Sequence, residues 1–101
     1  MKASKRERLR KAGFRIGGAA AFLGLSDEEQ ELVAMKLELV DGVKARRSEQ
    51  RITQAELARR LGSSQSRVAK LEAGDPSVGI ELLMRALLSL GATRKQIATL
   101  I

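Results

Sequence analysis

Side chains that can donate hydrogen bonds gather in one short stretch of the sequence, at Gln65, Ser66, Arg67 and Lys70. On a helix that begins near residue 65, these residues point outward, whereas Val68 and Leu71 point inward. Flexible polar donors on the exposed face of a helix N-terminus are suited to reading base edges in the major groove of DNA. The chemistry that this stretch indicates is therefore base recognition.

Catalytic chemistry has little support in the composition. The chain has no Cys and no His, so thiolate nucleophiles, disulfides, the usual zinc ligands and the commonest general base are missing. The carboxylates fall mainly at helix starts and on helix faces, where they form no catalytic constellation. We therefore expect no enzyme, no metal site, no cofactor and no small-molecule ligand.

Charge is distributed unevenly along the chain, whose formal net charge is +7. Residues 1–16 hold seven basic residues and one acidic residue, residues 17–42 hold six acidic and one basic, and residues 43–101 hold eleven basic and five acidic. The two basic parts suit a polyanion, because each Lys or Arg near a phosphate releases condensed counterions. The acidic middle should face away from DNA.

Two short helices joined by a tight turn should carry the polar donors. Thr53 and Glu56 have the spacing of a capping box, which opens a helix over residues 54–61. Gly62 follows at the position of a left-handed C-cap. The buried side of this helix should comprise Ala55, Leu57, Ala58 and Leu61.

The second of these helices should start after a serine cap, Ser63 or Ser64, and run to about Ala73. Together the pair has the geometry of a helix-turn-helix over residues 53–73. The first helix then braces against the phosphate backbone through Gln54 at its start, where backbone amides also attract phosphate. Ser64 and Arg59 are further candidates for phosphate contact, although Arg59 fits a solvated surface equally well.

Three more helices complete an all-α fold. Ser26 and Glu29 form a capping-box pattern that opens a long helix ending near residues 48–51. Ser77 should cap a helix that runs to about residue 90, and Thr93 with Gln96 should cap a last short one. The long helix has an apolar stripe wide enough to cover both the core and a partner surface.

The domain organisation that follows is a basic, Gly-rich arm over residues 1–25 and a folded domain over residues 26–101. The arm's basic run could contact DNA, a partner or only solvent. A basic segment before an apolar one superficially resembles a signal peptide, but glycines interrupt the apolar run and acidic residues follow it. No apolar run approaches the roughly 20 residues of a membrane span, and we expect a cytoplasmic protein.

The segment ITQAELARRLGSSQSRVAKLEAGDPS, residues 52–77, closely resembles the Xre/Cro-type helix-turn-helix family of phage repressors and bacterial regulators. The resemblance covers residues 43–90 and rests on TQAELA, LG, SQS and LExG at the family's spacing. It implies a lambda-repressor-like bundle of about five helices, with a central helix-turn-helix after a long helix. It also implies a homodimer on a palindromic operator in double-stranded DNA.

The resemblance also implies roles for single residues. Gln54 matches the family's phosphate-binding glutamine and Gln65 its base-reading glutamine, while Ser66 and Lys70 match further groove-facing positions. Arg47 and Glu72 match a partly buried ion pair between the first helix and the reading helix.

The segment FLGLSDEEQ, residues 22–30, leading into the long helix, looks like HigA-like antitoxins, which pair with a RelE-type toxin ribonuclease and repress their own operon. The residues that would contact a toxin are then Phe22, Leu23, Leu25, Leu32, Val33 and Leu37. Two alternatives remain: a stand-alone phage-type repressor without a toxin, and a protein-interaction module that binds no DNA.

Overall fold

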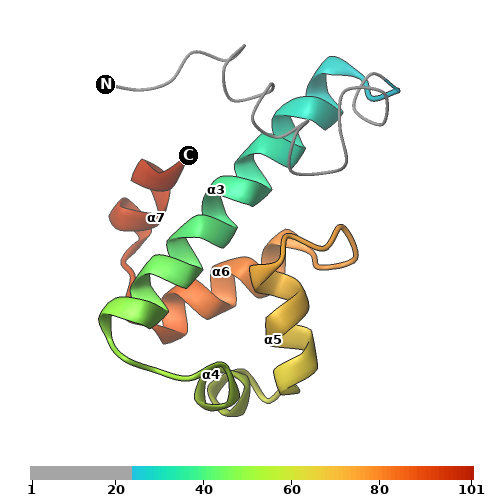
Figure 1. Ribbon diagram of the computed structural model, residues 1–101. Helices are drawn as coiled ribbons and strands as arrows, with labels where there is room; N and C mark the ends of the chain where they lie inside the picture. Colours follow the sequence, from blue (N-terminus) through green and yellow to red (C-terminus); the bar gives the residue numbers. More distant parts are fainter. Residues whose placement is uncertain (1–23) are drawn as a thin grey trace. The chain divides into compact units, whose positions relative to one another are not determined.

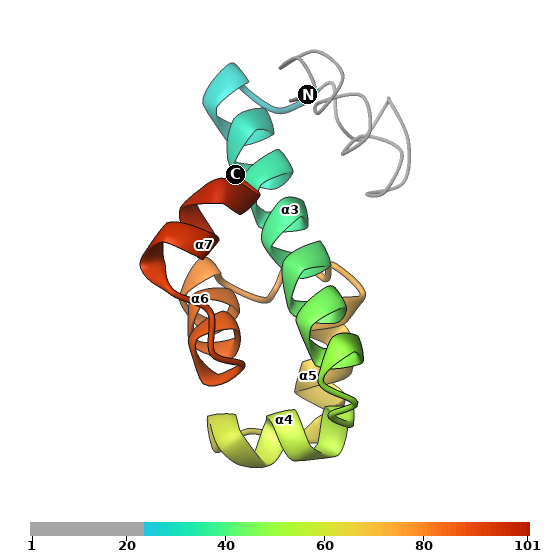
Figure 2. The same cartoon turned by 90° about the vertical axis from the view of Figure 1, so that its left-hand side faces the viewer.

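The computed structural model describes residues 24–101, and every regular element among them is a helix (Figures 1 and 2). The five helices are α3 (Asp27–Glu49), α4 (Gln54–Leu61), α5 (Gln65–Glu72), α6 (Ile80–Ser89) and α7 (Arg94–Leu100). The predicted all-α class is confirmed. The described residues fall into two units, one that contains residues 24–37 and one of residues 38–101, and α3 contributes residues to both.

The start of α3 has the predicted capping box. The Glu29 N–H donates to Ser26 Oγ at 3.2 Å, and the Ser26 N–H donates back to Glu29 Oε1 at 3.1 Å. The second of these bonds is the main reason that the pKa of Glu29 lies below its usual value, and the Ser26 hydroxyl lowers it further. The helix starts acidic and ends basic, in the sense that its dipole favours.

Within the first unit, the apolar residues of α3 differ in burial. Ala34 and Leu37 are buried, and the half-buried Leu25 and Val33 pack against them. Leu32, which the periodicity placed in the apolar stripe, is 47% exposed. Phe22 and Leu23, two of the expected partner contacts, lie outside the described residues.

The second unit has an aliphatic core to which all five helices contribute. The end of α3 supplies Leu39, Val40 and Val43, and α4 packs against both α5 and α6. Fully burying each such side chain contributes roughly 1.5–3 kcal/mol. The other buried members are Leu57, Ala58, Leu61, Val68, Leu71, Val78, Leu82, Leu83, Ala86, Leu87, Leu90, Ala92 and Ile97. Ala55 is exposed, which corrects its predicted burial, because it lies off the helix face that Ala58 and Leu61 bury.

Two arginines tie α4 and α6 together at their ends. Arg85 of α6 donates to the carbonyl of Leu61 at 3.1 Å, and Arg60 of α4 donates to the carbonyl of Ser89 at 3.4 Å. These carbonyls end their helices and have no partner within them, so each cation satisfies an acceptor at the negative end of a helix dipole. These two hydrogen bonds therefore help to fix the orientation of α4 relative to α6.

One predicted helix start is wrong. Gly79, not Ser77, is the N-cap of α6, and it makes no side-chain cap bond. The reason is that the Asp75 carboxylate accepts the Ser77 N–H at 2.8 Å, which forms an Asx turn, and the buried Val78 anchors the following residue. By contrast, α7 has the predicted capping box of Thr93 and Gln96.

No helix within residues 24–101 is long and apolar enough to cross a membrane.

Candidate nucleic-acid interface

The turn between α4 and α5 is set by Gly62. Its φ of 64° places it in the left-handed region, which a glycine enters without the Cβ clash that other residues meet. The Ser63 N–H donates to the Ala58 carbonyl at 2.9 Å, and the Gly62 N–H donates to the Arg59 carbonyl at 3.2 Å. These two bonds end α4 in a Schellman motif, so the direction in which the chain enters α5 is fixed.

The start of α4 departs from the predicted capping box. Thr53 Oγ1 accepts the Glu56 N–H at 3.1 Å, but the Glu56 carboxylate does not return to Thr53. It instead accepts from Arg59 at 2.9 and 2.6 Å and from Arg60 at 3.3 Å. The hydrogen bond from Arg59 is the largest reason that the pKa of Glu56 falls to about 2. Arg59, expected to contact phosphate, is therefore already paired, although its side chain is 72% exposed.

Ser64 is the N-cap of α5. Its Oγ accepts the Arg67 N–H at 3.2 Å and lies 3.1 Å from Ser66 Oγ. The hydroxyl that was a candidate for phosphate contact thus also organises the helix start, where unpaired backbone N–H groups attract anions.

The outward face of α5 presents the four residues that the sequence singled out. Val68 and Leu71 are fully buried, and Glu72 is buried beside them. Gln65, Ser66, Arg67 and Lys70 are all exposed. The buried residues fix the rotation of α5 about its axis, so the four polar side chains share a surface that can enter a groove.

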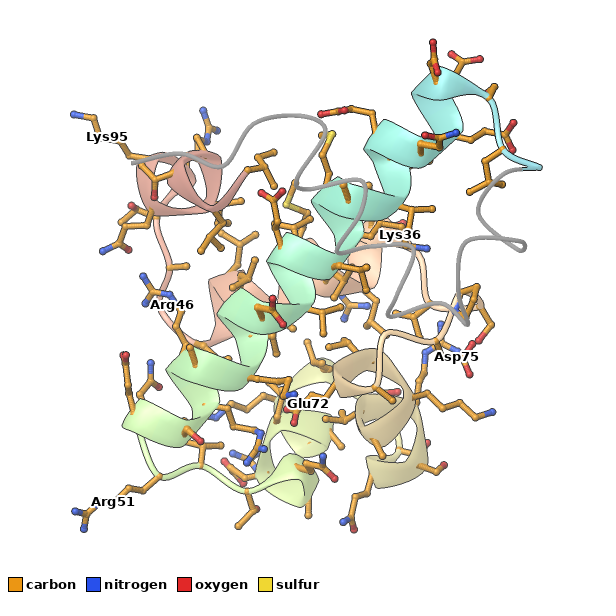
Figure 3. All side chains as sticks on the ribbon, turned by 45° about the horizontal axis from the view of Figure 1, so that its top comes forward. Lys36, Arg46, Arg51, Glu72, Asp75 and Lys95 are labelled. Atoms are coloured by element: carbon orange, nitrogen blue, oxygen red, sulfur yellow. The ribbon has the colours of Figure 1, made fainter. Side chains whose placement is uncertain are left out.

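Arg47 and Glu72 meet in the interior, as the family resemblance implied. Two Arg47 nitrogens donate to the Glu72 carboxylate, Nε to Oε2 at 2.5 Å and Nη2 to Oε1 at 2.8 Å. Gln54 Nε2 also donates to Glu72 Oε1, at 3.2 Å. Figure 3 shows Glu72 pointing into the space that α3, α4 and α5 enclose. One carboxylate therefore links the end of α3 to both helices of the helix-turn-helix, α4 and α5.

The charges of this cluster stabilise each other. Burial alone raises the pKa of Glu72, but hydrogen bonds from Arg47 and Gln54, with the positive charges of Arg47 and Lys44, outweigh it and lower that pKa below its usual value. The hydrogen bond to Glu72 raises the pKa of Arg47. Both groups are therefore charged at neutral pH.

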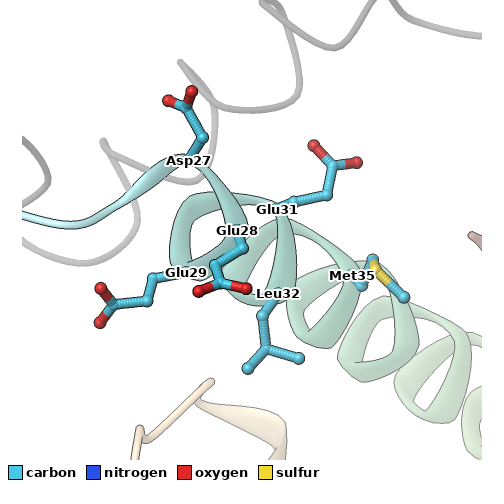
Figure 4. A pocket seen from close by; sticks show the side chains of 6 residues that line it. All are labelled: Asp27, Glu28, Glu29, Glu31, Leu32 and Met35. Atoms are coloured by element: carbon cyan, nitrogen blue, oxygen red, sulfur yellow. The ribbon is translucent and has the colours of Figure 1, made fainter.

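The expected partner surface lies on the first unit and is only partly accessible. Leu37 is buried and Leu25 and Val33 are half-buried, so only Leu32 of the described candidates is well exposed. A shallow hollow of about 650 Å³ surrounds it; its lining residues are Asp27, Glu28, Glu29, Glu31, Leu32 and Met35 (Figure 4). The surface at the start of α3 is thus acidic with an apolar centre.

The turn before α4 contains two features that the sequence pattern did not indicate. Arg51 has a φ of 55°, in the left-handed region where glycine is the usual signal. Gln50 Nε2 donates to the Leu90 carbonyl at 2.6 Å, across 40 positions of sequence. No local sequence pattern predicts either feature. An arginine is not a signal for a left-handed backbone, and the hydrogen bond between Gln50 and Leu90 joins residues that are distant in sequence.

A protein-family model described as helix-turn-helix matches residues 43–96. This range begins within α3, contains α4, α5 and α6 completely, and includes Arg47 with Glu72. Comparisons with curated proteins and with solved structures give no match.

Proposed function

Because the chain belongs to the helix-turn-helix family, whose model covers more than half of it, we propose that it is a sequence-specific DNA-binding transcriptional repressor. The observation that carries this proposal is the exposed row of Gln65, Ser66, Arg67 and Lys70 on α5. A helix fits the major groove of B-DNA, which is about 12 Å wide.

In this proposal, the first turn of α5 enters the major groove and reads bases. A glutamine amide can bind adenine N6 and N7 together, and an arginine can bind guanine O6 and N7. Gln65 and Arg67 have these groups, and Ser66 and Lys70 add donors on the same helix. The residues that hold α5 in place are Val68 and Leu71 in the core and Glu72 in the ion pair.

The start of α4 would hold the phosphate backbone. The amide nitrogen of Gln54 carries two hydrogens, and only one is needed for its bond to Glu72. The second hydrogen, with the backbone N–H groups of the first turn, can bind a phosphate. Ser64 and Arg59 would add phosphate contacts at the edge of this surface. Arg59 would give up one of its two hydrogen bonds to Glu56 to do so. Gln54 then connects the buried pair to the DNA.

We further propose that two copies bind a palindromic operator. Helix-turn-helix dimers present their reading helices to half-sites about one helical turn, roughly 34 Å, apart. A twofold arrangement of bound protein would therefore appear as an inverted repeat in the preferred DNA.

Selection of bound sequences from a random duplex pool tests the proposed function. We expect an inverted repeat with half-sites about 10–10.5 base pairs apart, and an affinity that falls steeply with salt, because each neutralised phosphate lowers the log–log slope by about 0.9. Enrichment of no sequence, together with an affinity independent of salt, would instead support a protein-interaction module.

A finer proposal is that this repressor is the antitoxin of a toxin–antitoxin module and covers a RelE-type toxin. The surface at the start of α3 supports it: an exposed Leu32 stands beside Met35 among carboxylates. A ribonuclease must present cations to the phosphates of its RNA substrate, so an acidic surface with an apolar centre complements such an enzyme.

Co-purification with the product of an adjacent small reading frame tests the antitoxin role. We expect Leu32→Arg to abolish the complex while DNA binding remains. Leu88→Arg is the matched control, because Leu88 of α6 is similarly exposed (54%) and lies outside this surface. If no toxin-like neighbour exists, or if the wild type does not bind the neighbour's product, the chain is a stand-alone repressor. If Leu32→Arg binds that product like the wild type, the surface at the start of α3 is not the contact.

A further inference from the structure

The turn between α3 and α4 has a hydrogen-bonded geometry that normally contains glycine. The Ile52 N–H donates to the Arg47 carbonyl at 3.0 Å, and the Arg51 N–H donates to the Ser48 carbonyl at 3.1 Å. This is the bond pattern of a Schellman motif, in which the residue in the place of Arg51 adopts a left-handed conformation. Arg51 does so with a φ of 55°, at the cost of a Cβ clash that glycine avoids.

The surrounding contacts hold this strained residue in place. On one side, Gln50 binds the Leu90 carbonyl at 2.6 Å. On the other, Arg47 Nη1 donates to the Ile52 carbonyl at 2.9 Å, and Arg47 is itself fixed by Glu72. A strained conformation persists where its surroundings over-determine it, and such residues concentrate at functional sites. The backbone at Arg51, and with it the direction of the bond from Cα to Cβ, is therefore fixed.

Arg51 extends into solvent and lies close in sequence to the proposed phosphate contact at Gln54. Arg51 is exposed, and Figure 3 shows it and Arg46 of α3 pointing outward on one side of the second unit, away from the interior Glu72. Arg51 precedes Gln54 by three residues, so their Cα atoms are at most about 11 Å apart. Phosphates of one strand succeed each other every 3.4 Å or so along the duplex axis.

We propose that Arg51, assisted by Arg46, binds backbone phosphates next to the one held at the start of α4, and so extends the grip on that strand beyond the bases read by α5. This inference rests on the proposed DNA-binding function. The ligand is the phosphodiester backbone, so the contact adds affinity independent of sequence. Glu49, at the end of α3, offsets part of the positive charge of Arg46 and Arg51. Binding then depends on where the Arg51 guanidinium lies and not on the net charge of this region alone.

The test compares two Arg51 variants of the full chain with the wild type on the selected operator duplex. Arg51→Gln should make the negative slope of log affinity against log salt concentration shallower by about 0.9 and leave base preferences unchanged. Lys95→Gln is the matched control: it removes the same charge from the exposed start of α7, labelled in Figure 3, and should leave the slope unchanged.

Arg51→Gly separates a binding role from a structural one. Glycine removes the backbone strain, so the melting temperature should rise by a few degrees while DNA affinity falls as in Arg51→Gln. A residue with only a structural role would change stability and affinity in the same direction. If the wild type binds DNA and both Arg51 variants keep its salt slope, this inference is wrong. If the wild type binds no duplex at all, it is the proposed function that fails.

Discussion

At the scale of single residues, the Glu72 carboxylate connects the motif's structure to its proposed function. Its side chain is 6% exposed and that of its partner Arg47 is 21% exposed. Removing one member of a buried pair is costly because the other charge loses its compensation. Gln54 shares the same carboxylate, so this cluster fixes both the reading helix and the proposed phosphate contact.

We predict that Glu72→Gln destabilises the fold at neutral pH by about 2–3 kcal/mol, less than the full cost for a deeply buried pair because Arg47 reaches solvent. Because the pKa of Glu72 is lowered on folding, its stabilisation is fully present above the pKa of the unfolded chain. It is lost as pH falls through the folded value.

Urea unfolding between pH 7 and pH 2 checks this prediction. The wild type should lose stability on acidification below roughly pH 4.5, and Glu72→Gln should lose less over the same range. Glu56→Gln serves as the control, because Glu56 also has a lowered pKa but makes its ion pairs at the surface, where they contribute little at neutral pH. Equal stability of Glu72→Gln and wild type at pH 7 would contradict a structural role for the pair.

At this scale, the sequence could predict only which side chains of a recognisable helix are exposed. The row at Gln65 and Lys70 follows from helical periodicity, because their neighbours Val68 and Leu71 are apolar. The pairing of Arg47 with Glu72 spans 25 positions and came from the family resemblance alone. The strained Arg51 had no signal, because its conformation depends on contacts with distant residues.

At the scale of elements, capping patterns predicted helix starts well where no other group competed for the cap. Ser26 and Thr93 form complete boxes with Glu29 and Gln96. At Thr53 the box is half-formed, because Arg59 takes the carboxylate that would have closed it. Such competition depends on side-chain conformations, which a spacing pattern does not contain.

We predict that Gly62→Ala destabilises the fold by about 1 kcal/mol. Nothing lies within 4 Å of the position where a Cβ would stand, so the cost comes from the φ of 64° alone. Thermal unfolding should then show a melting temperature lower by roughly 4–8 °C.

Gly79→Ala is the matched control for this prediction. Gly79 also has open space around its Cβ position, but its φ of −82° suits any residue. If the two variants melt together, the left-handed turn does not constrain the relative placement of α4 and α5.

At the scale of the whole molecule, charge separates the proposed DNA surface from the proposed partner surface. The excess of basic residues in 43–101 accompanies the family match, while the acidic residues concentrate at the start of α3. The sequence alone predicted this division, because net charge per segment needs no structure. It could not predict how much of the apolar stripe of α3 would be accessible, since burial of Leu37 and exposure of Leu32 depend on packing.

The central claim is that α5 reads bases through Gln65, and the most direct measurement is the affinity of the wild type and of Gln65→Ala for every single-base variant of the selected operator. We predict that Gln65→Ala loses discrimination of about 1–3 kcal/mol at one position of each half-site and keeps the wild-type preferences elsewhere. An identical pattern of preferences for the two proteins would contradict the claim and show that another surface reads the DNA.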